Sequence, residues 1–526
     1  MKIKILLLLL TLTICFKKNA ISQIDSITIS GRIDTTLMKE YATNELVIKS
    51  RYTANFYSRS EQITTIITRE GFFKIRFKPE NQFVYLSFEL LYKGNDSGKL
   101  GLYANISQYS RPWLQEQNEM YLFENGDIIN FTLGTKGNIL FKGKGSEKLN
   151  CQFQMYMIEP LSAGFVYRAV DYNNNGEMLK KLILQDSLID LGIKQRITIL
   201  NSYKKQLDII TYKLLYLDAI GSATYIPLSN ITGNCYLFPE EVNHLQKYYN
   251  IYLKKNQLPL IDSNYIAESA YYADMLFEKE FNYFRLNSKN KFYSKGDSFK
   301  EIYNQLKLHY SGKLRDKLLY ICFEKLNKYY SNESLPFVED ALKIMKNEIY
   351  ITLLKKFAEK EDHLYPFELP DDKGYQHKLS DFRGKVLIID FWFTGCSACA
   401  ILNTFMTPII SKFKNNRNVQ FISICVDQNK NMWLNSLNTG KYTTKNELNL
   451  YTNSLGQQHP MIQFHNLIGF PRQLIIGKKG EIITSTPPNV SSTPSGSMIN
   501  SQTTAEDVAY NTNVFTKIIE DYLKNN

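Results

Sequence analysis

Cys396 and Cys399 are separated by two residues and directly follow an apolar and aromatic run, KVLIIDFWF (385–393). A Cys-x-x-Cys pair can carry out thiol–disulfide exchange, supply half of a metal site, or form a disulfide that never turns over. The residues around the pair indicate which of these chemistries applies.

The pair lies where a buried strand passes into CSACAILNTFMTPIISKFK (396–414), a stretch of helical composition. The first turn of a helix has unpaired N–H groups and the positive end of the helix dipole, so a thiolate there is stabilised and its pKa falls. The i, i+3 spacing brings Cys399 to the same helix face, near enough to resolve a mixed disulfide. We predict a redox-active disulfide in which Cys396 attacks and Cys399 resolves.

Asp390 interrupts the apolar strand six residues before Cys396. A carboxylate inside a buried strand is unfavourable unless it is paired or has a chemical role. Burial raises the pKa of a carboxyl group, so Asp390 is predicted to accept and return the proton of the resolving thiol. The alternative is a solvated carboxylate at the strand end, or one that a neighbouring lysine neutralises.

Other chemistries fit the cysteine pair less well. A structural zinc site needs about four ligands, but there is no second cysteine pair, and His459 and His465 are six residues apart, outside the usual spacing. A peroxidase would need a threonine at a set upstream position, and Thr394 is only two residues before Cys396. No metal and no cofactor are predicted.

The chain of 526 residues is too long for one core and suggests about three or four domains. Its formal net charge is +12, but the Lys and Arg are scattered among Asp, Glu and Asn without a basic block, so no nucleic-acid partner is expected. Seven cysteines in such a length do not form a disulfide-stapled scaffold.

Residues 1–22 have the pattern of a cleaved export signal: a positive start (MKIK), a twelve-residue apolar core (ILLLLLTLTICF) and small residues near Ser22. Lipid attachment through Cys15 is not expected, because Ile14 is too bulky for the preceding position. No later run reaches about 18 apolar residues, so no transmembrane span is predicted.

Three further regions follow from the patterns. Residues 23–148 are predicted to form an all-β sandwich or barrel, with alternation in GFFKIRF (71–77) and a hairpin turn at Asn125-Gly126. Residues 149–362 are predicted to form an all-α domain, with an apolar stripe on one helical face from Leu200 to Leu217.

Residues 363–526 are predicted to form an α/β domain. The strands KVLIIDFWF (385–393) and NVQFISICVD (418–427) are apolar enough to be buried on both faces of a sheet. A hairpin turns at Lys478-Lys479-Gly480, residues 486–507 form a flexible polar loop, and the chain ends in a helix.

KVLIIDFWFTGCSAC, the β/α pattern after it and Gly469-Phe470-Pro471 before a hairpin resemble the thioredoxin family. The closer resemblance is to the TlpA/ResA-like thiol:disulfide oxidoreductases of the bacterial envelope, over about residues 363–526. The first part of the chain resembles, more weakly, a β-rich domain of unknown function found ahead of such modules.

The resemblance implies a cis proline at Pro471, substrate contact through the backbone of Phe470, and an aromatic residue, Trp392, packed at the site, all three being assigned to substrate binding. Ser397 and Ala398 replace the family's usual residues between the cysteines, so the direction of electron flow cannot be carried over.

The sequence therefore predicts an exported thiol–disulfide oxidoreductase of the periplasm or cell envelope that reduces protein disulfides. Its partners are protein disulfide or dithiol substrates and an envelope electron donor, with a possible peripheral association with the envelope. The alternative is an envelope binding or scaffold protein whose Cys-x-x-Cys pair is a structural disulfide, because two thirds of the chain is not thioredoxin-like.

Overall fold

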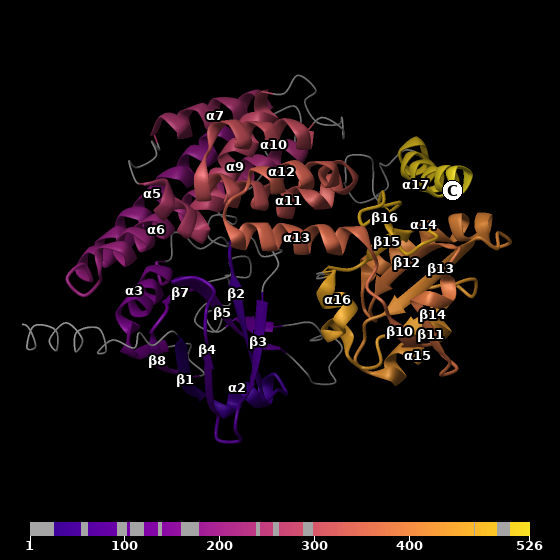
Figure 1. The fold of residues 1–526 in the computed structure, drawn as a ribbon, viewed down its shortest axis with the longest axis horizontal. Coiled ribbons are helices and arrows are strands. Elements are labelled where there is room, and N and C mark those ends of the chain that lie inside the picture. Colours follow the sequence, from indigo (N-terminus) through magenta and orange to yellow (C-terminus); the bar gives the residue numbers. More distant parts are fainter. Residues whose placement is uncertain are drawn as a thin grey trace, which may run out of the picture.

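The structure is a computed structural model that describes residues 26–53, 61–91, 103–105, 120–134, 139–158, 178–237, 242–255, 262–287, 298–465, 467, 469–491 and 505–526. The predicted export signal and Cys15 lie outside these residues. The chain has an amino-terminal β-rich region, a central helical region and a carboxyl-terminal α/β region (Figure 1).

The amino-terminal region is a sandwich of two sheets. The first sheet has the order β4-β1-β8-β9, and in the second, β3-β2-β5-β6, strand β7 also pairs with β5. Apolar residues of both sheets, such as Ile29 and Phe88, share one buried core. The elements are β1 (Ile27–Ile33), α2 (Thr35–Glu40), β2 (Glu45–Arg51), β3 (Glu61–Ile66), β4 (Phe72–Phe77), β5 (Phe83–Leu91), β6 (Tyr103–Asn105), β7 (Tyr121–Glu124), β8 (Ile128–Leu133) and β9 (Ile139–Lys144).

The central region is helical, and its largest core gathers apolar residues from several helices around α11. Its helices are α3 (Ser146–Tyr156), α5 (Met178–Ser202), α6 (Ile209–Leu237), α7 (Val242–Lys255), α8 (Ser263–Glu268), α9 (Ala270–Asn287), α10 (Ser298–His309), α11 (Gly312–Ser334), η5 (Leu335–Phe337), α12 (Val338–Ile344) and α13 (Glu348–Asp362). None of the helices in the described part of the chain is long and apolar enough to cross a membrane.

The carboxyl-terminal region is built on a five-stranded sheet of order β14-β13-β12-β15-β16. Strands β12, β13 and β14 are parallel, whereas β15 runs antiparallel to β12 and to β16. The elements are β10 (Glu368–Pro370), β11 (Gln376–Lys378), η6 (Leu379–Phe382), β12 (Val386–Trp392), α14 (Ser397–Phe413), β13 (Val419–Cys425), α15 (Lys430–Thr439), β14 (Leu448–Tyr451), η7 (Gly456–Gln458), α16 (Pro460–Phe464), β15 (Arg472–Ile476), β16 (Ile482–Thr484) and α17 (Ala505–Asn525).

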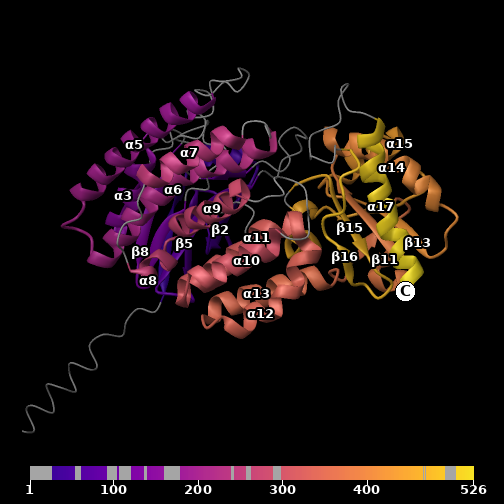
Figure 2. The ribbon, with the colours of Figure 1, turned by 90° about the horizontal axis from the view of Figure 1, so that it is seen from above.

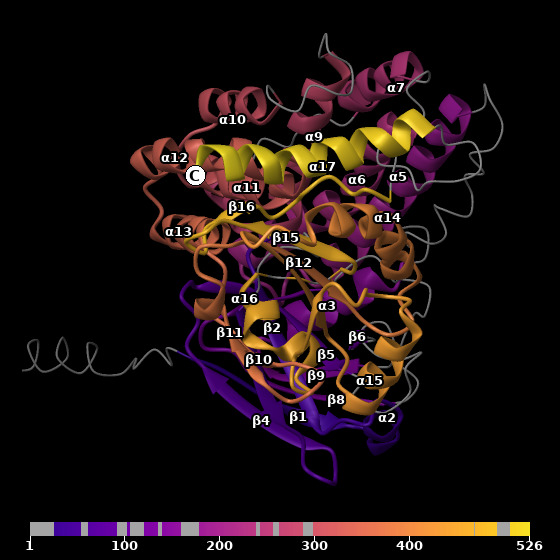
Figure 3. The same ribbon diagram turned by 90° about the vertical axis from the view of Figure 1, so that its right-hand side faces the viewer.

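Helix α13 leads from the helical region to the α/β region, while α14 and α17 cover the sheet (Figures 2 and 3). Phe515 and Ile519 of α17 pack in one core with Ile388 of β12 and with α14. At the junction, the Ser485 hydroxyl donates to Glu361 at the end of α13 (2.6 Å). The junction therefore joins the helical region to the edge of the sheet beside β16.

Three details differ from the sequence-based prediction. The hairpin at Asn125-Gly126 is wrong, because β7 pairs with β5 in one sheet and β8 pairs with β1 and β9 in the other. The chain does turn there, with Gly126 at φ 93°, but the turn carries it from one sheet of the sandwich to the other. Turn signals alone do not show which strand becomes the neighbour.

The single apolar stripe from Leu200 to Leu217 is also wrong as one helix. Helix α5 ends at Ser202 and α6 begins at Ile209, with turns between them. Leu200 and Leu214 are nevertheless buried in the same core, because the two helices pack against each other.

The predicted loop 486–507 is too long at its carboxyl end, because α17 already begins at Ala505. Residues 486–491 form no helix or strand, and Val490 among them is fully buried against the core that α14 and α17 share. Residues 492–504 lie outside the described residues.

Candidate functional site

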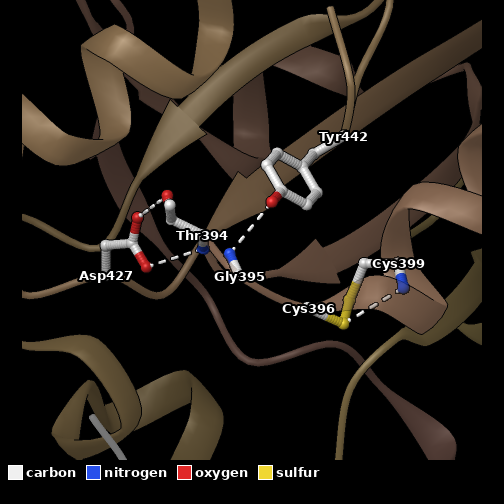
Figure 4. The surroundings of a disulfide bond; sticks show 6 residues. All are labelled: Thr394, Gly395, Cys396, Cys399, Asp427 and Tyr442. Carbon is white, nitrogen blue, oxygen red and sulfur yellow. Dashed lines mark hydrogen bonds between the residues drawn. A yellow bond between two sulfur atoms is a disulfide. The ribbon is translucent and has the colours of Figure 1, made fainter. Parts of the chain in front are cut away.

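Cys396 and Cys399 form a disulfide at the start of α14 (Figure 4). Cys396 is the N-cap of this helix, and its Sγ accepts a hydrogen bond from the backbone N–H of Cys399 (3.1 Å). Cys396 is 6% exposed, whereas Cys399 is fully buried. Cys396 is therefore the more accessible of the two sulfurs, which is consistent with its predicted role as the attacking thiol.

The turn before Cys396 is held by two polar side chains from other elements (Figure 4). Asp427, which follows β13, accepts from the backbone N–H (3.0 Å) and the hydroxyl (2.5 Å) of Thr394. The Tyr442 hydroxyl accepts from the backbone N–H of Gly395 (3.0 Å), a residue with φ of 96° that favours glycine. Burial raises the pKa of Asp427, and the hydrogen bonds from Thr394 oppose this shift.

An aromatic layer underlies the disulfide. The dithiol cluster comprises the buried residues Trp392, Cys396, Cys399, Cys425, Trp433, Tyr442 and Tyr451. In it, Trp392 stacks on Tyr442 with ring centroids 4.9 Å apart and donates to the Ser423 hydroxyl (2.6 Å). Trp392 is fully buried and packs with the disulfide, as the resemblance implies, and its assignment to substrate binding stays a prediction.

Phe470 and Pro471 lie beside the dithiol cluster. Phe470 is partly buried against that cluster, and its ring meets the ring of Phe393 edge-on with centroids 5.9 Å apart. The Phe470–Pro471 peptide bond is cis, as the resemblance implies. The fold therefore brings this segment to the disulfide from about 70 residues further along the chain.

Asp390 lies on the sheet face that α14 covers. Alternate residues of a strand share a face, and its neighbours on that face are Ile388, which packs with α14, and Trp392, which packs with the disulfide. Its Oδ1 is buried and accepts no hydrogen bond. Burial raises the pKa of Asp390 well above its ordinary value, and the Glu447 carboxyl raises it further.

Glu447 is a second carboxyl group near Asp390, and it was not predicted from the sequence. Its Oε2 accepts from the backbone N–H of Thr444 (2.6 Å) and the hydroxyl of Thr443 (3.0 Å). Burial raises the pKa of Glu447, and these hydrogen bonds oppose the shift.

Asp427, Tyr442 and Glu447 reach the site from segments that show no motif. The one available signal was that Asp427 follows a buried strand adjacent to the one before Cys396, since neighbouring parallel strands end at the same sheet edge. His459 and His465 bind backbone N–H groups of Met461 and Tyr365. Across the described residues, no three His, Cys, Asp or Glu side chains gather where they could hold a metal ion.

Part of this chain is similar in sequence to known proteins. A family model described as thioredoxin-like matches residues 384–482. The thiol-disulfide oxidoreductase ResA of Geobacillus kaustophilus is 29% identical over 123 residues, which make up 23% of this chain and 66% of that relative. ResA of Bacillus cereus is 24% identical over 148 residues, 27% of this chain and 81% of that relative.

Among solved structures, the thioredoxin domain of a thiol-disulfide oxidoreductase from Bacteroides vulgatus is 18% identical, with a TM-score of 0.23. That match covers 30% of this chain and 96% of the other. The ResA relatives support thiol–disulfide oxidoreductase activity for the matched part of the chain. Residues 384–482 of the carboxyl-terminal region thus match the thioredoxin-like family model, and this part of the chain is similar to the ResA thiol-disulfide oxidoreductases.

Proposed function

We propose that this protein is an exported thiol–disulfide oxidoreductase that reduces protein disulfides in the cell envelope. The observation that carries the proposal is the Cys396–Cys399 disulfide at the start of α14, in which Cys396 keeps a small exposed fraction and Cys399 keeps none. A disulfide with one accessible sulfur at a helix N-terminus suits exchange, because that sulfur can be attacked and can attack.

In the first step, the Cys396 thiolate of the reduced protein attacks one sulfur of a substrate disulfide. A bond forms between Cys396 Sγ and that sulfur, the substrate S–S bond breaks, and the other substrate sulfur leaves as a thiolate that takes a proton from water. The N–H of Cys399, which contacts Cys396 Sγ here, stabilises the attacking thiolate. The backbone beside Phe470 and Pro471 holds the substrate chain.

In the second step, Cys399 gives its proton to the Asp390 carboxylate and attacks Cys396 Sγ. The mixed disulfide breaks, the second substrate sulfur leaves and is protonated, and the Cys396–Cys399 disulfide seen here is formed. The substrate has gained two electrons and two protons. A dithiol donor in the envelope must then reduce the protein, which closes the cycle.

Export supports this assignment chemically, since disulfides form and persist outside the cytosol. The export signal proposed for residues 1–22 would deliver the protein to that compartment. The regions proposed at 23–148 and 149–362 would then serve to place the thioredoxin-like domain of residues 363–526 near its partners or the envelope surface.

The test is a trapping experiment with Cys399→Ser. Removing the resolving thiol leaves Cys396 able to attack but not to be released, so mixed disulfides with substrate proteins should accumulate and disappear on reduction. Cys425→Ser is the matched control, because Cys425 is a buried free cysteine of the same dithiol cluster. It should trap nothing.

A scaffold with a structural disulfide predicts a different result. Cys399→Ser would then form no adduct with envelope proteins or with a model protein disulfide, although Cys396 is free. That outcome would overturn the proposed function.

A further inference from the structure

A row of polar side chains crosses the central sheet beneath the disulfide. Strand register places Asp390 of β12 directly opposite Gln473 of β15 on one side and Ser423 of β13 on the other, and Ser423 opposite Asn449 of β14. Partners in register point to the same face, so the row lies on the face that α14 covers. Such a row is unusual in strands that are otherwise apolar.

Gln473 and Asp390 present complementary atoms that are both unpaired. Gln473 is 7% exposed, and its Nε2, a donor, is buried without a hydrogen bond. The Asp390 Oδ1, an acceptor, is buried without one as well. Directly opposed residues in an antiparallel pair have Cβ atoms about 5 Å apart, so a small rotation would let the amide donate to the carboxylate. A buried carboxylate gains most from such a donor when it is ionised.

On the other side of Asp390, the neighbouring side chain is Ser423, which already has a hydrogen-bond partner. The Ser423 hydroxyl accepts from Trp392 Nε1 (2.6 Å). Beyond it, the Thr443 hydroxyl contacts both Asn449 (2.7 Å) and Glu447 (3.0 Å), so this end of the row is tied to the Glu447 carboxyl. Burial raises the pKa of Glu447, whereas the hydrogen bonds to its Oε2 favour the ionised form. When ionised, Glu447 opposes a second negative charge at Asp390.

Among the residues that the structure describes, the other titratable side chains near Asp390 do not offer a counter-charge. Helix α14 contributes Cys399, strand β13 contributes Cys425, and the segment after β13 contributes Asp427. Arg472 of β15 interacts with Glu361 of α13 instead. Helix α17 contributes the apolar residues Phe515 and Ile519 to the core on this face.

We propose that Gln473 and Glu447 are positioning residues that act on the Asp390 proton in opposite directions. The Gln473 amide stabilises the Asp390 carboxylate by donating to it, whereas the fixed Glu447 carboxylate favours return of the proton. The purpose of this balance rests on the proposed function: Asp390 must accept the Cys399 proton during resolution and release it afterwards. No hydrogen bond in the described part of the chain joins either residue to the sulfur of Cys396 or Cys399.

The test measures Asp390 protonation directly, without turnover. Infrared difference spectra of the full-length oxidised and reduced protein across pH follow the carboxyl stretch, and Asp390→Asn identifies the band. Glu447→Gln should lower the midpoint by about one pH unit, because it removes a nearby like charge. Gln473→Met should raise it by about one pH unit, because it removes the only proposed donor to the carboxylate.

Two further variants test whether the charge of Glu447, rather than its packing, shifts the Asp390 midpoint. Glu447→Asp keeps the charge and should restore the wild-type midpoint. Glu368→Gln removes an exposed carboxylate from β10 of the same region and should leave the midpoint unchanged. If Glu447→Gln or Gln473→Met fails to fold, Glu447→Leu and Gln473→Leu should give the same two signs.

Opposite shifts support the proposal, while shifts in the same direction, or a wild-type midpoint in either variant, overturn it. The proposed function fails separately. An absence of trapped mixed disulfides with Cys399→Ser would refute the oxidoreductase, yet the Asp390 midpoint would still be measurable in every variant.

Discussion

Asp427 receives two hydrogen bonds from the same residue, Thr394, one from its backbone N–H and one from its hydroxyl. The two residues are 33 positions apart, and Asp427 is 1% exposed. This pair ties the end of β13 to the turn that presents Cys396. The position of the sulfur therefore depends on a side chain from the adjacent strand.

Replacement of Asp427 by Ala should lower the free energy of unfolding by about 2 kcal/mol, because the Thr394 backbone N–H loses its acceptor and the Thr394 hydroxyl keeps only its contact with the Ser436 hydroxyl (2.7 Å). Chemical denaturation of the oxidised protein would measure the change. Asp372→Ala, in an exposed hairpin turn, is the control and should have little effect. Equal losses in the two variants would argue against a fixed turn.

Asp390 should make the protein less stable as pH rises. Its pKa is raised in the folded protein, so the folded state holds more protons than the unfolded state between the unfolded pKa of about 3.8 and the folded pKa. Stability is therefore greatest below this window and is lost through it. Asp390→Asn should flatten the dependence and have a higher free energy of unfolding than the wild type at pH values above this window. The measurement is the free energy of unfolding of both proteins, obtained from denaturation at several pH values. The same pH dependence in the two proteins would contradict this prediction.

His465 should have the opposite dependence. Burial lowers its pKa to about 4, and its Nε2 accepts from the backbone N–H of Tyr365 (2.9 Å). The neutral ring is favoured in the folded state, so its contribution is present above the unfolded pKa of 6.5 and is lost as pH falls towards 4. His465→Gln should remove most of that loss, which amounts to about 3 kcal/mol. His363→Gln, at an exposed ring, should leave it in place.

Cys151, Cys322 and Cys425 should resist alkylation in the native reduced protein. Burial raises the pKa of Cys151 to about 12 and also raises the pKa values of the other two thiols. Cys396 should react at least about 100-fold faster, because it is more accessible and its thiolate is stabilised. Mass spectrometry after timed alkylation would measure the rates. Comparable rates for Cys396 and Cys425 would mean that the dithiol cluster opens readily.

The sequence predicted the parts of the site that lie close together along the chain. Cys396, Cys399 and Asp390 occupy one strand–helix junction, where periodicity and spacing are informative. Pro471 required a family resemblance, because a cis bond leaves no local pattern.

The remaining parts depend on long-range pairing. Tyr442 and Glu447 reach the site because β14 lies next to β13. Gln473 lies opposite Asp390 because β15 lies next to β12. The Asn125-Gly126 turn failed for the same reason, since its residues specify a reversal but not the sheet that receives the next strand. Local sequence patterns indicate where helices and strands form, whereas the pairing of those strands is determined by how the whole core packs.

One short segment, residues 440–447, connects α15 to β14 and supplies both Tyr442 and Glu447. Asn403 of α14 fastens its start by donating to the carbonyl oxygens of Gly440 and Lys441. Near its start, Tyr442 accepts a hydrogen bond from the turn that carries Cys396. At its end, Glu447 lies near Asp390, the acid proposed to serve the buried Cys399. Exchanging residues 440–447 between related proteins would thus change the reactivity of the Cys396 sulfur and the acidity of Asp390 together. The two properties would be inherited as one unit.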